Sequence, residues 1–267
     1  PADALGWKAV AVNVSDLAAM GAAPGQALLA ASFPRDLAVE RAEALAAGLH
    51  AALNEWDVAL VGGDTVATPG PLTLSLTLLG RVAPEAALRR SGARPGDTVY
   101  VTGTLGDAAA GLELLQAPPA EWLDHHARLT ERHSRPRPPL AFGQAIAGAA
   151  SAAIDISDGL VRDLGHVARA SGVGIELEPS RIPLSAPMGE HAWTTGADPL
   201  PLALAGGEDF ELAFTAGPEA FEALHRAKYT TDTRFTAVGR VTAERPGEVF
   251  GDGVPEAGGY DHFPGEP

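Results

Sequence analysis

Apolar residues recur in the first third of the chain with the spacings of helices and strands. From Leu37 to Leu53 they return at every fourth position between charged residues, which predicts an amphipathic helix. Leu72 to Val82 instead alternates Leu with Thr and Ser, the period of a half-buried strand. Gly6 to Met20 suits a helix that packs against a sheet. Asp16 interrupts this apolar stretch, so it lies on an exposed helix face or binds a ligand.

Two continuous apolar runs favour strands. Gln26 to Phe33 ends at Pro34 and fits a buried strand, although a helix segment also fits. Val58 to Thr65 predicts a short strand that ends in Gly62 and Gly63, after which Asp64 presents a carboxylate at the carboxyl end of the strand. A glycine turn closed by an aspartate is the purely structural alternative.

A change in composition marks the predicted domain boundary. Pro84 to Arg90 is short and helical in character, and Ser91 to Asp97 is rich in turn residues. We place the boundary near residues 83–96, which gives an N-terminal α/β domain over 1–83 and a C-terminal α/β domain over 84–267. The guanidinium group of Arg90 either binds a phosphate through its paired N–H groups or forms a salt bridge at the surface.

The second half mixes strand and helix patterns without regular alternation. Thr98 to Asp107 predicts a strand that enters a glycine-rich turn before a helix, a plausible phosphate cradle that matches no nucleotide-binding fingerprint. His125, His126 and His133 lack the helical spacing of a zinc protease, and we expect them at the surface. The fold class predicted is α+β or mixed α/β.

Ile154 to Leu164 predicts a strand, an acidic turn and a helix. Asp155 ends the strand, and Ser157 or Asp158 caps the helix. Because Asp155 and Asp158 stand three positions apart with no basic residue between them, the turn concentrates charge where Mg²⁺ could bind. Simple helix capping is the alternative.

The composition of the chain excludes several classes of partner and chemistry. The formal net charge is −15 and no Lys/Arg-rich run occurs, which argues against nucleic acid as a partner. The chain has no cysteine, which excludes disulfides and thiolate chemistry. Without a signal peptide or a long apolar run, we expect a cytoplasmic protein and no membrane partner.

Five acidic residues occur where apolar segments end or are interrupted, and together they favour a phosphate site that binds several metal ions. They are Asp16, Asp64, Asp155, Asp158 and Glu208.

Several segments resemble, in the right order and over nearly the whole chain, the motif series of the thiamine-monophosphate kinase family in the aminoimidazole-ribonucleotide-synthetase-like superfamily. They are Asn13–Ala22, Gly62–Thr65, Arg90–Ala93 with Val101–Gly103, Asp155–Gly159 and Gly206–Leu212. The resemblance implies a two-domain architecture, a homodimer joined through strands of the first domain, and ATP-dependent phosphorylation of thiamine monophosphate to thiamine diphosphate.

The resemblance also implies roles for individual residues. Mg²⁺ would be bound by Asp16, Asp64, Asp155 and Asp158, and ATP would be contacted by Gly63, Arg90 and Ser157. The thiamine moiety would be contacted by Glu208, with Asp209 as the alternative, and by Tyr260, with Phe263 as the alternative.

One part of the family pattern has no counterpart in this sequence. Family members begin with a segment that carries a glycine–aspartate motif and a Ser/Thr-Thr-Asp motif, and neither occurs here. We therefore expect an incomplete first domain. The alternatives are another ATP-dependent synthetase of the superfamily and a truncated, non-catalytic nucleotide-binding protein.

Overall fold

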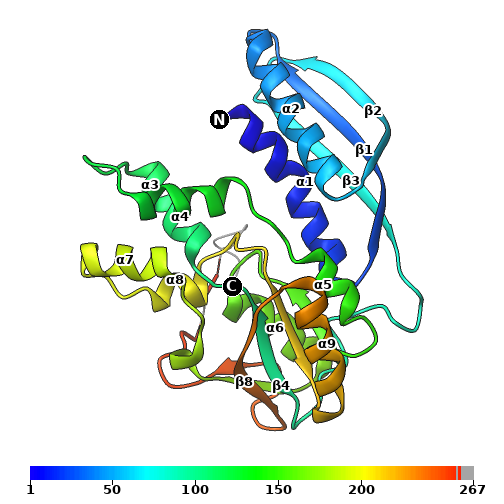
Figure 1. Ribbon diagram of the computed structural model, residues 1–267, viewed down its shortest axis with the longest axis vertical. Helices are drawn as coiled ribbons and strands as arrows, with labels where there is room; N and C mark the ends of the chain where they lie inside the picture. The colour runs from blue at the N-terminus through cyan, green and yellow to red at the C-terminus, as the bar shows by residue number, and fades with distance from the viewer. Residues whose placement is uncertain (257, 260–267) are drawn as a thin grey trace.

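The computed structural model describes residues 1–256 and 258–259, which build two sheets covered by helices (Figure 1). The first sheet has the order β2-β1-β3, from strands β1 (Ala23–Pro34), β2 (Ala59–Thr68) and β3 (Thr73–Arg81). β1 pairs with β2 in parallel and with β3 antiparallel. Helices α1 (Ala2–Ala19) and α2 (Val39–Glu55) lie side by side against one face of this sheet (Figure 1). The helices predicted over Gly6–Met20 and Leu37–Leu53 are thus confirmed.

The contact between α1 and α2 depends on two glycines. A Cβ at Gly48 would lie 1.8 Å from the carbonyl oxygen of Asp3, and one at Gly6 would lie 2.1 Å from that of Leu45. Only glycine lets the two backbones approach so closely. The apolar faces of both helices then share a core with the sheet, built on Trp7, Val10, Ala11, Val14, Ala27, Leu49, Ala52, Leu53 and Val58.

The second sheet has the order β5-β7-β4-β8-β6-β9. Its strands are β4 (Thr98–Thr102), β5 (Ala152–Asp155), β6 (Gly174–Leu177), β7 (Leu212–Ala216), β8 (Phe235–Thr242) and β9 (Val249–Phe250). Side chains alternate between its faces: Ala213 of β7 belongs to the core shared with α6 (Leu160–Ser171) and α8 (Leu200–Ala205). Phe214 belongs to the opposite core, with α5 (Leu140–Ala145) and α9 (Phe221–Thr231). The sheet is therefore buried on both faces.

A layer of three further helices flanks the second sheet. α3 (Asp107–Gln116), α4 (Asp124–Ser134) and α7 (Ala186–Thr195) share a small core of Ala110, Leu114, Leu129 and Met188. Short 3-10 turns span Pro179–Arg181 and Pro218–Ala220. Among the residues that the structure describes, no helix has the length and apolar character needed to cross a membrane.

The prediction that His125 and His126 lie at the surface is wrong. Both belong to α4, and their exposed fractions are 5% and 6%. The reason is that α4 packs against both α3 and α7, and α7 lies far along the chain, so the local polar pattern does not reveal this burial.

Strands β1 and β2 also differ from expectation. β1 is a strand, but only one of its faces is covered, so Ala27 and Ala31 are buried while Leu28 is 45% exposed. β2 continues through Gly62 and Gly63 to Thr68 instead of ending there. A Cβ at Gly63 would lie 1.8 Å from the carbonyl oxygen of Leu29, so only glycine at this position lets β1 pack this closely against β2.

The segment Pro84–Arg90 is not helical. Its backbone groups bond to other parts of the chain, since the N–H of Leu88 donates to Met20 and the carbonyl of Arg89 accepts from Ala153. These bonds fix the segment between the end of α1 and strand β5, which brings the two sheets into one structure.

The glycine contact between α1 and α2 can be tested directly. Replacing Gly48 with alanine should lower the free energy of unfolding by about 1–3 kcal/mol, because the new methyl group must displace the α1 backbone. Gly189→Ala is the matched control, since this glycine is inside α7 and no described atom lies within 4 Å of a Cβ placed there. Alanine should be neutral there or add up to about 1 kcal/mol. Denaturant unfolding measures both, and equal losses would refute the close contact.

Candidate functional site

Asp155, the last residue of β5, lies beside the final turns of α1. It is only 6% exposed, and the Ser15 hydroxyl donates to its Oδ2 at 2.8 Å. Burial raises the pKa of Asp155, the Ser15 hydrogen bond lowers it, the charge of Asp16 raises it and Arg90 lowers it. Asp16 is exposed, yet partial desolvation raises its pKa, and the charge of Arg90 opposes this rise. Two carboxylates and one guanidinium therefore meet where α1, β5 and the segment before β4 converge.

This carboxylate pair fits a hard cation. Asp155 is buried beside a second carboxylate and accepts its Ser15 hydrogen bond from a neutral group, so the charged forms of the pair are disfavoured in the protein alone. A divalent ion with oxygen ligands would stabilise both charges. The donor set is the one that Mg²⁺ prefers.

The turn after Asp155 is organised by a residue that we did not single out from the sequence. Oδ2 of Asp163 accepts the backbone N–H groups of Ser157, Asp158 and Gly159 at 3.0, 3.0 and 3.1 Å. Burial is the largest cause of a pKa of about 7 for Asp163; the N–H donors lower the pKa, and Asp158 and Asp155 raise it. The expectation that Ser157 or Asp158 caps α6 is therefore wrong, because Asp163 binds these amides from inside the helix. An acidic residue in the first helical turn was the available signal.

A second acidic loop lies against this turn. The N–H of Glu208 donates to the carbonyl of Ser157 at 2.8 Å, and the N–H of Phe210 donates to that of Ile156 at 2.9 Å. Glu208 has a left-handed backbone, with φ of 70°. The loop from residue 206 to 211 and the loop from 156 to 159 thus form one continuous surface.

Glu208 reaches two basic side chains from other elements. Its carboxylate lies 2.9 Å from Nζ of Lys8 on α1 and 3.3 Å from Nδ1 of His133 on α4. Neither partner was singled out from the sequence as a site residue. These contacts place a partly exposed carboxylate between the two domains suggested by the sequence.

Asp209, next in sequence, has a structural role. It is 2% exposed, and its carboxylate accepts the N–H groups of Gly106 and Ala108 at 2.7 and 3.2 Å. Burial is the main cause that raises the pKa of Asp209 to about 7. The glycine-rich turn and α3 N-terminus, predicted as a phosphate cradle, therefore bind the chain's own carboxylate. Glu208, not Asp209, presents its carboxylate at the surface.

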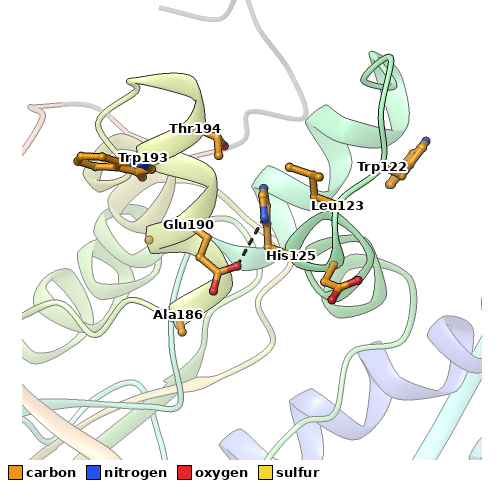
Figure 2. A pocket seen from close by; sticks show the side chains of 9 residues that line it. Trp122, Leu123, His125, Ala186, Glu190, Trp193 and Thr194 are labelled. Atoms are coloured by element: carbon orange, nitrogen blue, oxygen red, sulfur yellow. Dashed lines mark ion pairs between the residues drawn. The ribbon is translucent and has the colours of Figure 1, made fainter.

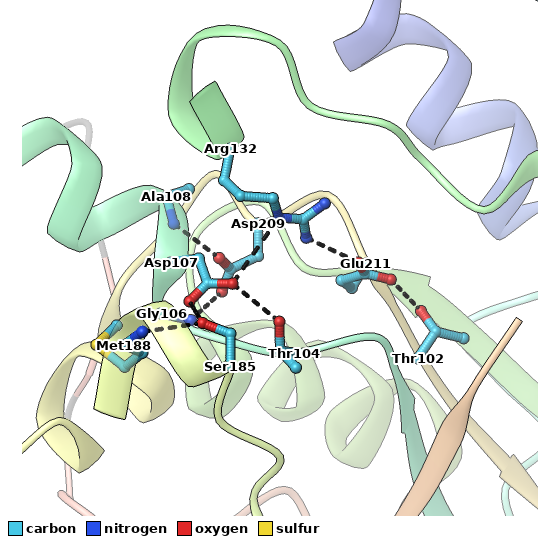
Figure 3. A network of polar contacts seen from close by, with 10 residues as sticks. All are labelled: Thr102, Thr104, Gly106, Asp107, Ala108, Arg132, Ser185, Met188, Asp209 and Glu211. Atoms are coloured by element: carbon cyan, nitrogen blue, oxygen red, sulfur yellow. Dashed lines mark hydrogen bonds and ion pairs between the residues drawn. The ribbon is translucent and has the colours of Figure 1, made fainter. Parts of the chain in front are cut away.

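A polar network fixes the base of this loop (Figure 3). Glu211 accepts hydrogen bonds from the Thr102 hydroxyl at 2.6 Å and from the Arg132 guanidinium at 2.8 Å. Asp107 accepts the hydroxyl protons of Thr104 at 2.9 Å and Ser185 at 2.6 Å. Because these groups come from β4, α3, α4 and the start of α7, the network locks the Glu208 loop onto the helical layer.

Basic side chains gather on the other side of the Asp158 turn. Burial, then the charges of Arg169, Arg90 and Arg162, lower the pKa of His166, so three guanidinium groups lie near one imidazole. Arg162 also pairs with Asp158, with 3.6 Å between Nε and Oδ2. A groove of about 750 Å³ runs along this side of α6. This positive region offers anion-binding groups next to the carboxylates.

Two of the predicted positions belong to the first sheet. Asp64 and Gly63 are on the exposed strand β2, where Asp64 Oδ1 accepts the N–H of Thr65 at 2.9 Å. Tyr260 and Phe263 lie outside the described residues.

Comparison with known proteins gives a consistent result. The family models described as AIR synthase related protein, N-terminal domain and C-terminal domain, match residues 1–82 and 94–252. The thiamine-monophosphate kinase of Salmonella typhimurium is 46% identical over 269 residues, covering 98% of this chain and 81% of that protein. That of Aquifex aeolicus is 38% identical over 262 residues, with the same coverage.

Solved structures agree. The thiamine-monophosphate kinase of Stenotrophomonas maltophilia superposes with a TM-score of 0.87 at 40% identity, covering 96% of this chain and 80% of that one. A structure described as AaThiL complexed with AMPPCP and TMP gives a TM-score of 0.89 at 38% identity, covering 98% and 81%. The resemblance noted in the sequence is confirmed, and the chain belongs to the thiamine-monophosphate kinase family, with its mixed α/β, two-domain AIR synthase-like fold.

Proposed function

We propose that this chain transfers a phosphoryl group from ATP to the phosphate of thiamine monophosphate and so produces thiamine diphosphate. The observation that carries the proposal is the buried Asp155 carboxylate beside Asp16 and Arg90. The neighbour solved with AMPPCP and TMP, at 38% identity, supports the same pair of substrates.

Two anionic substrates repel each other and an acidic protein. Asp16, Asp155 and Asp158 would hold Mg²⁺, with Asp64 as a further ligand. Bound Mg²⁺ would neutralise the charge that accumulates between the two phosphates. The protein then has to position the groups and keep its carboxylates ionised. No general base is required, because the acceptor phosphate is already ionised.

The residues around the turn have complementary roles in this proposal. Arg90 and Ser157 would contact the ATP phosphates, and Gly63 would contribute from β2. Asp163 acts as a positioning residue, because its three accepted hydrogen bonds fix the conformation of the Ser157–Gly159 turn. The turn would not have to become ordered when ATP binds.

The thiamine moiety carries a positive thiazolium ring, which suits a carboxylate. Glu208 would supply it, held in place by Lys8 and His133. The positive charge of Lys8 would also limit the repulsion between Glu208 and the substrate phosphate, whereas burial and the charge of Lys8 lower the pKa of His133. Tyr260 would contribute an aromatic contact.

We also infer a cytoplasmic homodimer whose first domain, residues 1–83, pairs through the outer face of its sheet. On the face opposite α1 and α2, Leu28, Val66 and Leu79 are 45%, 48% and 55% exposed. Asp64, paired with Ala30 in the β1–β2 register, belongs to the same face. A second copy would cover these apolar side chains and could approach Asp64. Residues 84–267 would form the second domain.

Asp155→Asn tests the proposed reaction. The amide can still accept the Ser15 hydrogen bond but removes a charge, so we expect an intact fold and a loss of turnover of at least about 100-fold. The assay measures thiamine diphosphate formed from thiamine monophosphate, ATP and Mg²⁺, with ATP-induced thermal stabilisation recorded alongside. Asp36→Asn, at an exposed turn, is the control and should be as active as the unmodified chain. Near-normal turnover by Asp155→Asn would exclude the metal role.

Asp163→Asn tests the positioning of the turn. Because the folded-state pKa of about 7 lies above the value in the unfolded chain, the unfolded state loses its proton first as the pH rises. This residue's contribution to stability is therefore complete below about pH 4 and is lost as the pH approaches 7, by up to about 4 kcal/mol. Asn keeps one oxygen acceptor and should flatten this decline. Urea unfolding in the absence of metal, at several pH values, measures it; an equally steep decline in both proteins would overturn the argument.

Val66→Lys tests the dimer. A charge on the outer sheet face should turn a homodimer into a monomer, because the lysine would have to be buried without a partner. Val39→Lys is the control, since Val39 is 67% exposed on α2, away from that face. Analytical ultracentrifugation distinguishes the states. A monomeric unmodified chain would disprove the inferred dimer.

A further inference from the structure

Three histidines from two helices converge outside the site described above. His125 and His126 belong to α4, and His191 belongs to α7. One ring nitrogen from each lies within 4.8 Å of the others. The ring centroids of His125 and His126 are 4.2 Å apart, and the His191 centroid is 5.9 and 5.8 Å from them.

The surroundings of this cluster favour neutral imidazoles, whose nitrogen lone pairs can bind a metal ion. Burial, followed by the charge of His125, lowers the pKa of both His126 and His191. Among the described residues, Nε2 of His125 and Nδ1 of His191 are buried without a hydrogen-bond partner. Buried polar atoms without partners are uncommon in folded proteins, so their presence points to a ligand.

A carboxylate orients one of the rings. Oε2 of Glu190 lies 3.6 Å from Nδ1 of His125, so it faces the ring nitrogen opposite the unpartnered Nε2 (Figure 2). A proton on Nδ1 would leave the Nε2 lone pair available. Histidines that bind metals are commonly oriented by a carboxylate in this way.

We propose that His125, His126 and His191 form a binding site for a first-row transition-metal ion, with Zn²⁺ as the best fit. Imidazole nitrogens are preferred ligands of Zn²⁺ and poor ligands of Mg²⁺. Tetrahedral Zn–N bonds of about 2.0–2.1 Å place two ligand atoms roughly 3.3 Å apart, which rotation of the side chains can reach. Three protein ligands leave one position for water.

Binding of a metal ion would break one hydrogen bond of His126. The backbone N–H of Leu123 donates to Nδ1 of His126 at 3.2 Å. Coordination through Nε2 needs the proton on Nδ1, so this long hydrogen bond would be replaced by the metal bond. The amide of Leu123, the N-cap residue of α4, can bind water instead.

An entry path leads to the cluster. A groove of about 870 Å³ is lined by His125 and Glu190 together with Trp122, Leu123 and Trp193 (Figure 2). The other two histidines, His126 and His191, line a second pocket of about 410 Å³. A metal ion bound by the cluster would join α4 to α7. Arg132 and His133, later in α4, contact Glu211 and Glu208, so the metal would stiffen the helix that holds the Glu208 loop.

The test uses the full chain without a histidine tag, freed of metal by a chelator. Calorimetric titration with Zn²⁺ in excess Mg²⁺, which occupies the carboxylates, should give one ion per chain and a rise in melting temperature. His125→Gln and His191→Gln should each weaken Zn²⁺ binding at least about 10-fold, and Glu190→Gln should weaken it about 10-fold as an orienting residue. His225→Gln, at an exposed histidine of α9, should change nothing.

Thermal unfolding without Zn²⁺ separates metal binding from folding. If the variants melt at the temperature of the unmodified metal-free chain but lose the increase caused by Zn²⁺, the site is established. Should the variant proteins not fold, Glu190→Gln, which keeps all three imidazoles, still reports on the site. The proposal is overturned if Zn²⁺ does not bind in excess Mg²⁺, or if it binds equally to His125→Gln and His191→Gln.

Discussion

Buried carboxylates that accept backbone N–H groups hold the candidate site together. Asp163 binds three consecutive amides of the turn after β5, and Asp209 binds two at the start of α3. A carboxylate in such a position replaces the water that these amides would otherwise bind. These hydrogen bonds favour the observed conformation of both loops and so support the positions of the surface carboxylates beside them, Asp158 and Glu208.

This arrangement divides a strongly acidic sequence into two kinds of carboxylate. Asp163, Asp209 and Glu211 are directed inward and satisfied by backbone amides, a hydroxyl or Arg132. Asp16 and Glu208 are directed to the surface, where a cation or a cationic substrate can meet them. The inward group organises the backbone and the outward group carries charge, so neighbouring residues such as Glu208 and Asp209 differ in role although they are chemically alike.

Local patterns predicted what local forces determine. The helix over Leu37–Leu53 and the strand, turn and helix around Asp155 were predicted because their apolar spacing and turn residues are contained in the segments themselves. Pro84–Arg90 was misassigned because its hydrogen bonds go to Met20 and Ala153, which no local pattern contains.

The same limit explains the errors in the site. The ordered motifs identified the family and the carboxylates near β5, yet the role of Asp163 depends on the fold of the preceding turn. The burial of His125 depends on α7, more than fifty positions later in the chain. Distant contacts, not residue type, decided these positions.

The chemistry of the ligands keeps the two cation sites proposed here distinct. Carboxylate oxygens near Asp155 suit an ion that also binds phosphate, whereas the imidazoles of His125 and His191 suit an ion that prefers nitrogen. When Mg²⁺ is in large excess, each ion would thus bind its own site. Helix α4 links them physically, because it carries His125 at its start and Arg132 and His133 near its end. Since Arg132 and His133 contact the Glu208 loop, the rigidity of one helix connects the histidine cluster to the substrate side of the molecule.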